Sequence, residues 1–300
     1  MTGDLLPART VPWAHWLTAV RPVTLSAAVA PVLVGTAAAG ADDHFRPLVF
    51  VATLAAALLI QIGTNLANDL FDYEHGADTE ERLGPPRVTQ SGLIAPEQVR
   101  LGTYAVFGAA AAIGLYLAFV GGWPILAIGA FSIVAGVVYT GGPWPLGYHG
   151  LGDLVVFVFF GLVAVVGSYY LQAETLSAVA FVAAVPVGLV VTAILVANNL
   201  RDIETDARAG KRTLAVRLGE RATRLQYILF VLAPYACVPV LLLLDAGPWV
   251  WLAWLTLPIA LTLSRSVLLG AVGRELNPVL KRTAQLHLAF GALLALGLLL

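Results

Sequence analysis

Nine long apolar runs constrain the fold of this chain more than any other feature of its sequence. Glycine, proline or charged residues bound the runs, which cover residues 23–40, 47–67, 101–120, 123–140, 153–172, 177–197, 225–244, 249–270 and 283–300. A helix of about 20 apolar residues is long enough to cross the hydrocarbon core of a bilayer. Because the runs are continuous and do not alternate apolar with polar residues, they exclude a membrane β-barrel. We therefore predict an all-α polytopic membrane protein with nine transmembrane helices.

The composition fits a chain that lies almost wholly in a lipid bilayer. Hydrophobic residues make up 59% and charged residues 12% of the sequence, against about 45–50% and 25% in soluble domains. We therefore expect a single transmembrane domain over residues 1–300. The net charge of -1 provides no basic field, so nucleic acid is not an expected partner. The one cysteine, Cys237, excludes an intramolecular disulfide and a cysteine-based metal site.

The distribution of basic residues predicts the orientation of the chain in the membrane. With a cytoplasmic N-terminus, 16 of the 17 lysine and arginine residues fall on the cytoplasmic side, and only Arg46 falls outside. An excess of these residues in cytoplasmic loops is usual for multi-pass membrane proteins. We therefore expect a protein of the cell membrane with two long polar segments, 68–100 and 198–224, facing the cytoplasm.

Acidic and amide side chains recur at helical spacing where each polar segment begins. The first stripe comprises Asn65, Asn68, Asp69 and Asp72 and is followed by Asp78; the second comprises Asn198, Asp202 and Asp206. Residues three, four, seven and eight positions apart share one face of a helix. The pentapeptides NDLFD (68–72) and NNLRD (198–202) align without gaps, which indicates a degenerate internal repeat.

Clustered carboxylates near a bilayer are costly unless a cation or hydrogen bonds compensate their charge, and a divalent metal ion fits this need. The ligands on offer are oxygens, which favour Mg²⁺ or Ca²⁺ over zinc, and Mg²⁺ is commonly held by a few carboxylates, waters and a substrate phosphate. Segment 198–224 carries seven basic against four acidic residues, whereas segment 68–100 carries seven acidic against three basic residues. The two segments therefore predict a metal-dependent site for a phosphate-bearing substrate, with its active site towards the cytoplasm.

Four segments carry a resemblance to a known family. They read RPVTLSAAVAPVLVGT (21–36), NDLFDYEHGADTEERLGPPRVTQSG (68–92), YTGGPWPLGYHGLGD (139–153) and NNLRDIETDARAGKRTLAVRLG (198–219). Over nearly its whole length the chain resembles the UbiA superfamily of intramembrane prenyltransferases, and within it the 1,4-dihydroxy-2-naphthoate polyprenyltransferases of menaquinone synthesis. The resemblance implies a nine-helix bundle that transfers a polyprenyl group from polyprenyl diphosphate to 1,4-dihydroxy-2-naphthoate. The transfer would require Mg²⁺, release carbon dioxide and give demethylmenaquinone.

The same resemblance implies roles for individual residues. Asp69, Asp72 and Asp78 would hold Mg²⁺ on the diphosphate with help from Asn65 and Asn68, while Asp202 and Asp206, beside Asn198 and Asn199, would hold a second ion. Arg87, Lys211 and Arg212 would contact diphosphate oxygens, and Tyr139 would lie beside the allylic end of the donor. Gly76 stands where the hydroxybenzoate branch has its third acidic residue, and no lysine follows Tyr139 closely. Both departures favour a naphthoate over 4-hydroxybenzoate.

For two residues of the segment 139–153 the sequence leaves two alternative roles open. Glycines around His149 allow a close approach to a ligand, so His149 is either a contact for the aromatic substrate or an ordinary loop residue. Asp153 either orients or deprotonates the substrate hydroxyl, or serves as an acidic residue favoured at a helix N-terminus. The rings of Tyr139 and Tyr148 are candidates to stabilise an allylic cation.

Two other classes of membrane protein suit the sequence less well. A secondary transporter would suit the spans and the repeat, but it usually carries charges near the middle of the membrane. Between residues 101 and 200 the sequence has only two charged residues, Asp153 and Glu174, and both lie at predicted helix ends. A phosphatidyltransferase is disfavoured because no DxxDGxxAR motif is present. Prenylation of another aromatic acid, such as 4-hydroxybenzoate, stays the nearest alternative.

Overall fold

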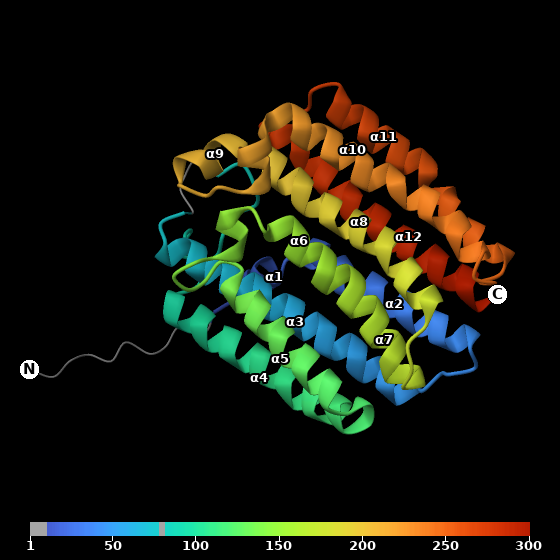
Figure 1. Cartoon of the computed structure of the whole chain (residues 1–300). Helices are drawn as coiled ribbons and strands as arrows, with labels where there is room; N and C mark the ends of the chain where they lie inside the picture. Colours follow the sequence, from blue (N-terminus) through green and yellow to red (C-terminus); the bar gives the residue numbers. More distant parts are fainter. Residues whose placement is uncertain (1–10, 78–81) are drawn as a thin grey trace, which may run out of the picture.

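The computed structural model describes residues 11–77 and 82–300, in which all regular structure is helical. The elements are α1 (Trp13–Val20), η1 (Pro22–Leu25), α2 (Ser26–Ala41), α3 (Pro47–Glu74), α4 (Pro96–Gly121), α5 (Trp123–Val138), η2 (Leu146–His149), α6 (Gly152–Val156), η3 (Phe157–Val163), α7 (Ala164–Ala173), α8 (Ala178–Arg201), α9 (Ile203–Arg208), α10 (Leu214–Leu242), η4 (Pro248–Thr256), α11 (Leu257–Leu268), η5 (Gly273–Glu275) and α12 (Leu276–Leu299). Figure 1 shows these helices as one bundle.

Eight helical stretches in the described residues are long and apolar enough to cross a membrane. They are Pro22–Ala41, Pro47–Glu74, Pro96–Gly121, Gly152–Ala173, Ala178–Arg201, Leu214–Leu242, Pro248–Leu268 and Gly273–Leu299. The remaining predicted span corresponds to α5, which is apolar but has only 16 residues. The predicted all-helical, multi-pass membrane architecture is therefore confirmed with eight candidate spans, and the count of nine is not.

Proline and glycine set the ends of several spans. α3 and α4 begin at Pro47 and Pro96, where the fixed φ of proline suits the first helical position and its missing N–H costs nothing. α4 and α5 are separated by Gly122, whose φ of 76° lies in the region that favours glycine. This turn folds α5 back against α4.

The helices carry both polar stripes beyond the apolar runs, with one difference from the prediction. α3 continues through Asp72 to Glu74, so the first stripe lies on one helix as expected. α8 ends at Arg201, and Asp202 leaves the helix with φ -103° and ψ 11°. Asp206 therefore lies on the separate short helix α9, and the expected continuous helix through the second stripe is wrong.

Small residues allow the spans to pack closely. A Cβ atom on Gly35 of α2 would overlap the backbone of Val165 on α7, and one on Gly161 of η3 would collide with Gly188 of α8. Helices in membranes commonly associate through such small residues. In Figure 1, α3, α4 and α5 form one side of the bundle and α8, α10, α11 and α12 the other, with α2 and α7 packed together between them.

Candidate active site

Two adjoining cavities lie between the two sides of the bundle. The larger, of about 720 Å³, has an almost wholly apolar wall formed by α2 to α8. The smaller, of about 170 Å³, lies where α3 and α8 end, and polar side chains dominate its wall. Four residues line both cavities, namely Asn68, Tyr139, Leu195 and Asn198. We call the two the apolar cavity and the polar chamber.

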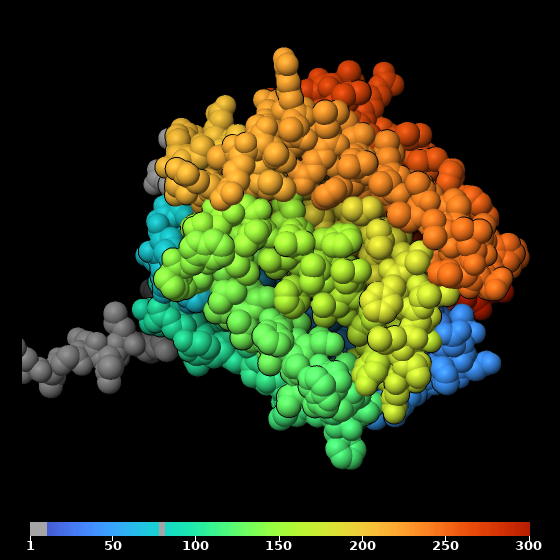
Figure 2. Space-filling model, viewed as in Figure 1, coloured from blue at the N-terminus to red at the C-terminus, as the bar shows by residue number. Residues whose placement is uncertain are grey.

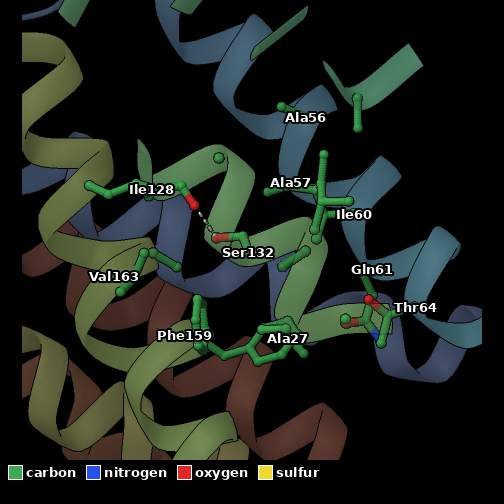
Figure 3. Close-up of a pocket in the computed structure, with 18 of the residues that line it drawn as sticks. Ala27, Ala56, Ala57, Ile60, Gln61, Thr64, Ile128, Ser132, Phe159 and Val163 are labelled. Carbon is green, nitrogen blue, oxygen red and sulfur yellow. Dashed lines mark hydrogen bonds between the residues drawn. The ribbon is translucent and has the colours of Figure 1, made fainter. Parts of the chain in front are cut away.

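The apolar cavity is suited to a hydrocarbon. Ile60 of α3, Ile128 of α5 and Phe159 and Val163 of η3 face one another across it (Figure 3). Figure 2 shows a hollow in the surface between the green residues of α5 and the yellow-green residues of η3 and α7, which line this cavity. For a hydrocarbon that leaves water, burial on such a wall contributes roughly 25 cal/mol per Å² of apolar surface.

Asp72 is the hub of the polar chamber and is only 2% exposed. Its Oδ2 accepts a hydrogen bond from Arg87 Nη2 at 2.8 Å, and its Oδ1 accepts from Lys211 Nζ at 2.9 Å and from the Tyr148 hydroxyl at 2.6 Å. The Lys211 ammonium also lies 4.6 Å from the centroid of the Tyr148 ring. One carboxylate thus gathers two cations from distant loops.

Asp202 is paired instead with its neighbour in sequence. The Arg201 guanidinium donates to both carboxylate oxygens of Asp202 at 2.8 and 2.6 Å. It also donates to the side-chain oxygens of Asn198 and Asn277 at 2.7 and 2.8 Å. Asn277, from the start of α12, in turn donates to the carbonyl of Leu83 at 2.9 Å. Hydrogen bonds through Asn277 therefore connect the second stripe to α12 and to the loop that follows the first stripe.

Asp206 of α9 is the third carboxylate of the polar chamber. Burial raises its pKa to about 7. Lys211 opposes this rise, whereas the negative charges of Asp202 and Asp72 add to it. Burial and two nearby negative charges disfavour the ionised form of this carboxylate, so an added positive charge would stabilise it. The polar chamber consequently suits a cation.

Asp69 turns away from both cavities. Its two carboxylate oxygens accept hydrogen bonds from the backbone N–H groups of Thr89 at 2.9 Å and Val88 at 3.2 Å. The Arg21 guanidinium lies 3.6 Å from the same carboxylate. Asp69 therefore anchors the loop that carries Arg87, rather than lining the chamber itself.

Most of the residues predicted from the sequence come together in the polar chamber. Its wall includes Asn68, Asp72, Arg87, Tyr139, Asn198, Asn199, Asp202, Asp206 and Lys211. Asn65 lines the apolar cavity, and Asp78 lies outside the described residues. Four predicted residues line neither cavity, namely Asp69, Asp153, His149 and Arg212.

Asp153 and His149 have local partners instead. Asp153 is buried and accepts a hydrogen bond from Gln226 Nε2 at 2.6 Å. The His149 ring stacks on Trp144 with 4.2 Å between centroids, and its Nδ1 lies 2.8 Å from the carbonyl oxygen of Pro145. These placements favour the loop and helix-terminus roles that the sequence left open.

Sequence reasoning missed several contacts in the polar chamber and among the residues that support its wall. Thr140 lies in the glycine-rich segment 139–153, and its hydroxyl donates to Asn68 Oδ1 at 2.8 Å. Tyr148 was named from the sequence for its ring, but its hydrogen bond to Asp72 was not expected. Arg201 is part of the pentapeptide NNLRD, so the sequence showed that it is next to Asp202 but not that its side chain points towards that carboxylate. Asn277 gave no signal, because it lies in a segment far from both stripes.

The described residues do not form a metal site without further ligands. Within residues 11–77 and 82–300, no three histidine, cysteine or acidic side chains come close enough to hold an ion. Mg²⁺, however, usually keeps several waters and takes one or two carboxylates together with substrate phosphates. The oxygens of Asp72, Asp202 and Asp206 fit that requirement when a phosphate group shares the chamber.

Comparison with known sequences identifies related proteins. Residues 28–299 match the model of the UbiA prenyltransferase family. The 1,4-dihydroxy-2-naphthoate octaprenyltransferase of Mycobacterium tuberculosis is 43% identical over 274 residues, which is 90% of this chain and 92% of that protein. The enzyme of the same name from Escherichia coli is 39% identical over 295 residues, which is 95% of each chain.

Solved structures share the fold at low sequence identity. The apo structure of a UbiA homologue from Aeropyrum pernix matches with a TM-score of 0.70 and 15% identity, over 91% of this chain and 97% of that one. A UbiA homologue from Archaeoglobus fulgidus, bound to GPP and Mg²⁺, matches with a TM-score of 0.63 and 14% identity, over 93% and 99%. The helical arrangement described above is therefore shared with these proteins.

Proposed function

The chain belongs to the UbiA prenyltransferase family, and from this premise we propose that it transfers a polyprenyl group from polyprenyl diphosphate to 1,4-dihydroxy-2-naphthoate. One observation carries the proposal: the polar chamber and the apolar cavity adjoin and share Asn68, Tyr139, Leu195 and Asn198 in their walls. A molecule with an anionic head and a long hydrocarbon tail fits two such cavities in series. The names of the bacterial relatives support dihydroxynaphthoate as the second substrate.

The donor would lie with its diphosphate in the polar chamber and its tail in the apolar cavity. Arg87 and Lys211 are already held in the chamber by Asp72, with their cationic groups in place for phosphate oxygens. Fixed cations stabilise negative charge as it develops on a departing group, and they do so more strongly in a site of low dielectric. These residues would therefore assist the departure of diphosphate.

Mg²⁺ is the metal that best suits this arrangement, and the A. fulgidus homologue supports it. Asp72 would hold one ion, with Asp78 as the further ligand that the family resemblance implies. Asp202 and Asp206 would hold a second ion. When bound, the metal supplies charge neutralisation to the diphosphate. Asp69 would act indirectly, by fixing the loop that carries Arg87.

The apolar wall protects the reacting carbon. Loss of diphosphate leaves an allylic cation, and exclusion of water from the cavity prevents its hydrolysis. Tyr139 lies where the two cavities meet, and an aromatic face can stabilise a desolvated cation by about 2 kcal/mol. The ring carbon that carries the carboxylate then forms the new carbon–carbon bond. The bond to the carboxylate breaks, carbon dioxide leaves, and the product is the naphthalene diol that corresponds to demethylmenaquinone in its reduced form.

The proposal includes the orientation of the protein in the cell membrane. With α5 as the ninth crossing and a cytoplasmic N-terminus, the polar chamber faces the cytoplasm, in keeping with 16 internal basic residues. Single cysteines at Arg208 and Asp245, each in a Cys237→Ser background, test this. The first should react with an impermeant thiol reagent only from the cytoplasmic side and the second only from outside. The reverse pattern would contradict the orientation.

Product analysis tests the activity itself. The purified protein is incubated with Mg²⁺, a polyprenyl diphosphate and either 1,4-dihydroxy-2-naphthoate or 4-hydroxybenzoate, and products are identified by mass. We expect a prenylated, decarboxylated naphthalene diol that disappears when EDTA replaces Mg²⁺. Prenylation of 4-hydroxybenzoate alone would make the protein a prenyltransferase for the other aromatic acid. Activity that survives EDTA would contradict the metal requirement.

A further inference from the structure

One polar side chain in the wall of the apolar cavity has a hydrogen-bond acceptor that no donor satisfies. Gln61 lies on α3, two helical turns before Asn68, and is only 6% exposed. Figure 3 shows it beside Thr64, at the end of the cavity away from Ile128. A buried amide with an unpaired oxygen needs a reason, because burying a polar group without partners costs free energy.

The neighbours of Gln61 fix which end of its amide faces which way. Asn65 Nδ2 donates to the backbone carbonyl of Val20 at 2.8 Å, so Asn65 Oδ1 must be the accepting end. Gln61 Nε2 donates to that oxygen at 3.3 Å and to Thr24 Oγ1 at 3.2 Å. The Thr24 hydroxyl donates its own hydrogen bond to the carbonyl of Arg21 at 2.9 Å.

The oxygen of Gln61 is consequently left without a donor. Within the part of the chain that the structure describes, its Oε1 is buried and accepts no hydrogen bond. An unsatisfied buried acceptor costs about 1–3 kcal/mol, and most buried polar groups in proteins are paired. Flipping the amide does not help, because it would place Oε1 against two oxygen atoms. A ligand that brings an O–H or N–H group would satisfy it.

The chemistry of the two substrates decides which one can do so, and this step rests on the proposed function. A polyprenyl tail has no O–H or N–H group, and an ionised diphosphate only accepts hydrogen bonds. The aromatic diol has two hydroxyl groups, each of which donates. We infer that Gln61 Oε1 accepts a hydrogen bond from one hydroxyl of the aromatic substrate and so positions its ring in the apolar cavity.

The position of Gln61 along α3 suits this role. Seven residues separate it from Asn68, which corresponds to about 10 Å along the helix axis, and its hydrogen bond to Asn65 turns the amide towards Asn68. Gln61 lines the apolar cavity, and the terminal torsion of a glutamine side chain is soft, so its amide can turn Oε1 towards a donor bound there. An aromatic substrate whose hydroxyl is bound to Gln61 would place its ring between the polyprenyl tail and the residues that the two cavities share.

Binding measurements on naphthoates that lack one hydroxyl test the inference. The protein, loaded with Mg²⁺ and an unreactive polyprenyl thiolodiphosphate, is titrated with 1,4-dihydroxy-2-naphthoate, 1-hydroxy-2-naphthoate and 4-hydroxy-2-naphthoate. Since a hydrogen bond to a buried acceptor is worth about 1.4 kcal/mol, one of the two monohydroxy compounds should bind roughly tenfold more weakly than the diol. This difference should vanish in Gln61→Met, while the affinity for the thiolodiphosphate stays within about twofold.

Two variants separate this role from a general effect on folding. Gln61→Glu keeps an accepting oxygen, since a glutamic acid buried in apolar surroundings stays protonated, and should preserve the discrimination. Gln172→Met makes the same chemical change at a buried glutamine near the outer end of α7, which lines neither cavity, and should bind all three naphthoates like the wild type.

Each outcome decides the matter. Equal binding of the three naphthoates by the wild type, or full discrimination by Gln61→Met, would overturn the inference. If Gln61→Met does not fold, loss of discrimination in a folded Gln61→Glu would overturn it as well. Absence of any prenylated product in the wild type would contradict the proposed function instead, because binding is measured here without turnover.

Discussion

The ends of α3 and α8 carry nearly the same pentapeptide and use it differently. Asn68 and Asn198 occupy the same place in NDLFD and NNLRD, and both line the two cavities. Asp72 and Asp202 also correspond, and both lie in the polar chamber. Asp72, however, draws its cations from loops far along the chain, whereas the cation on Asp202 is its neighbour Arg201.

This difference separates what helical register decides from what tertiary structure decides. Register alone puts the corresponding residues on the same face of each helix end. The partners depend on which loops reach that face. The Asp72 carboxylate is bonded to residues 15 and 139 positions away. Among the residues that the structure describes, the Asp202 carboxylate is bonded to Arg201, the residue before it. We therefore expect substitutions at the end of α3 to have larger effects than matching ones at the end of α8.

The largest effect is expected from Asp72→Asn, which leaves Arg87 and Lys211 without the carboxylate that holds them. We predict a fall of roughly 1,000-fold in kcat/KM, against roughly 100-fold for Asp202→Asn, because removal of one group that stabilises developing charge costs about 10²–10³. Steady-state assays of both variants measure this. Glu74→Gln, an exposed position on the same helix, serves as control and should stay near wild type. A larger loss for Asp202→Asn would break the comparison.

The next effect concerns two adjacent cations. Lys211 lies in the polar chamber, whereas Arg212 is exposed and lines neither cavity. Lys211→Met should weaken donor binding by about tenfold to 100-fold, since a hydrogen bond to a charged group is worth about 1.5–3 kcal/mol. Arg212→Met should change it less than about threefold. Titration with a polyprenyl thiolodiphosphate measures both, and equal losses would place Arg212 in the diphosphate site after all.

Asp69 should behave as an anchor rather than as a metal ligand. Asp69→Asn presents an amide N–H to the backbone donors of Val88 or Thr89, so we expect a loss of about 1–3 kcal/mol of stability. In detergent this corresponds to a fall in Tm of several degrees, with turnover reduced less than about tenfold. A Tm like that of the wild type combined with a loss of activity equal to that of Asp72→Asn would restore Asp69 to the metal site.

Asn277→Ala should have the smallest effect. It removes two hydrogen bonds, the one from Arg201 to Asn277 of α12 and the one from Asn277 to the carbonyl of Leu83. Because Arg201 keeps Asp202 and Asn198 as partners, we expect kcat/KM to fall by about twofold to fivefold, as for loss of one net hydrogen bond. A loss comparable to that of Asp202→Asn would show that the second end depends on distant partners as much as the first.

The sequence predicted which polar residues lie near one another better than it predicted their partners. Helical spacing grouped Asn68 with Asp72 and Asn198 with Asp202, and all four line the polar chamber, because helical register is a local property. The direction of Asp69 depends on backbone groups about 20 residues away, and nothing local reveals it. Asp206 was expected on the same helix as Asp202 because spacing alone does not show where a helix ends.

The cavities themselves were outside the reach of sequence patterns. Gln61 was readable as a lone amide in the apolar run 47–67, but its unmet hydrogen bond appears only when Thr24 and Asn65 are packed against it. The family resemblance predicted the fold and the activity that the relatives support. It did not predict that His149 would stack on Trp144 outside both cavities.

Counting bound metal ions tests most directly whether the two helix ends hold one diphosphate between them. Mn²⁺, which accepts the same oxygen ligands as Mg²⁺, is titrated into the protein with a polyprenyl thiolodiphosphate and followed by electron paramagnetic resonance. We expect two Mn²⁺ ions per chain, coupled to each other through the shared diphosphate, and one ion each in Asp72→Asn and Asp202→Asn. Two ions in both variants, or two ions without coupling, would contradict a single site built from both ends.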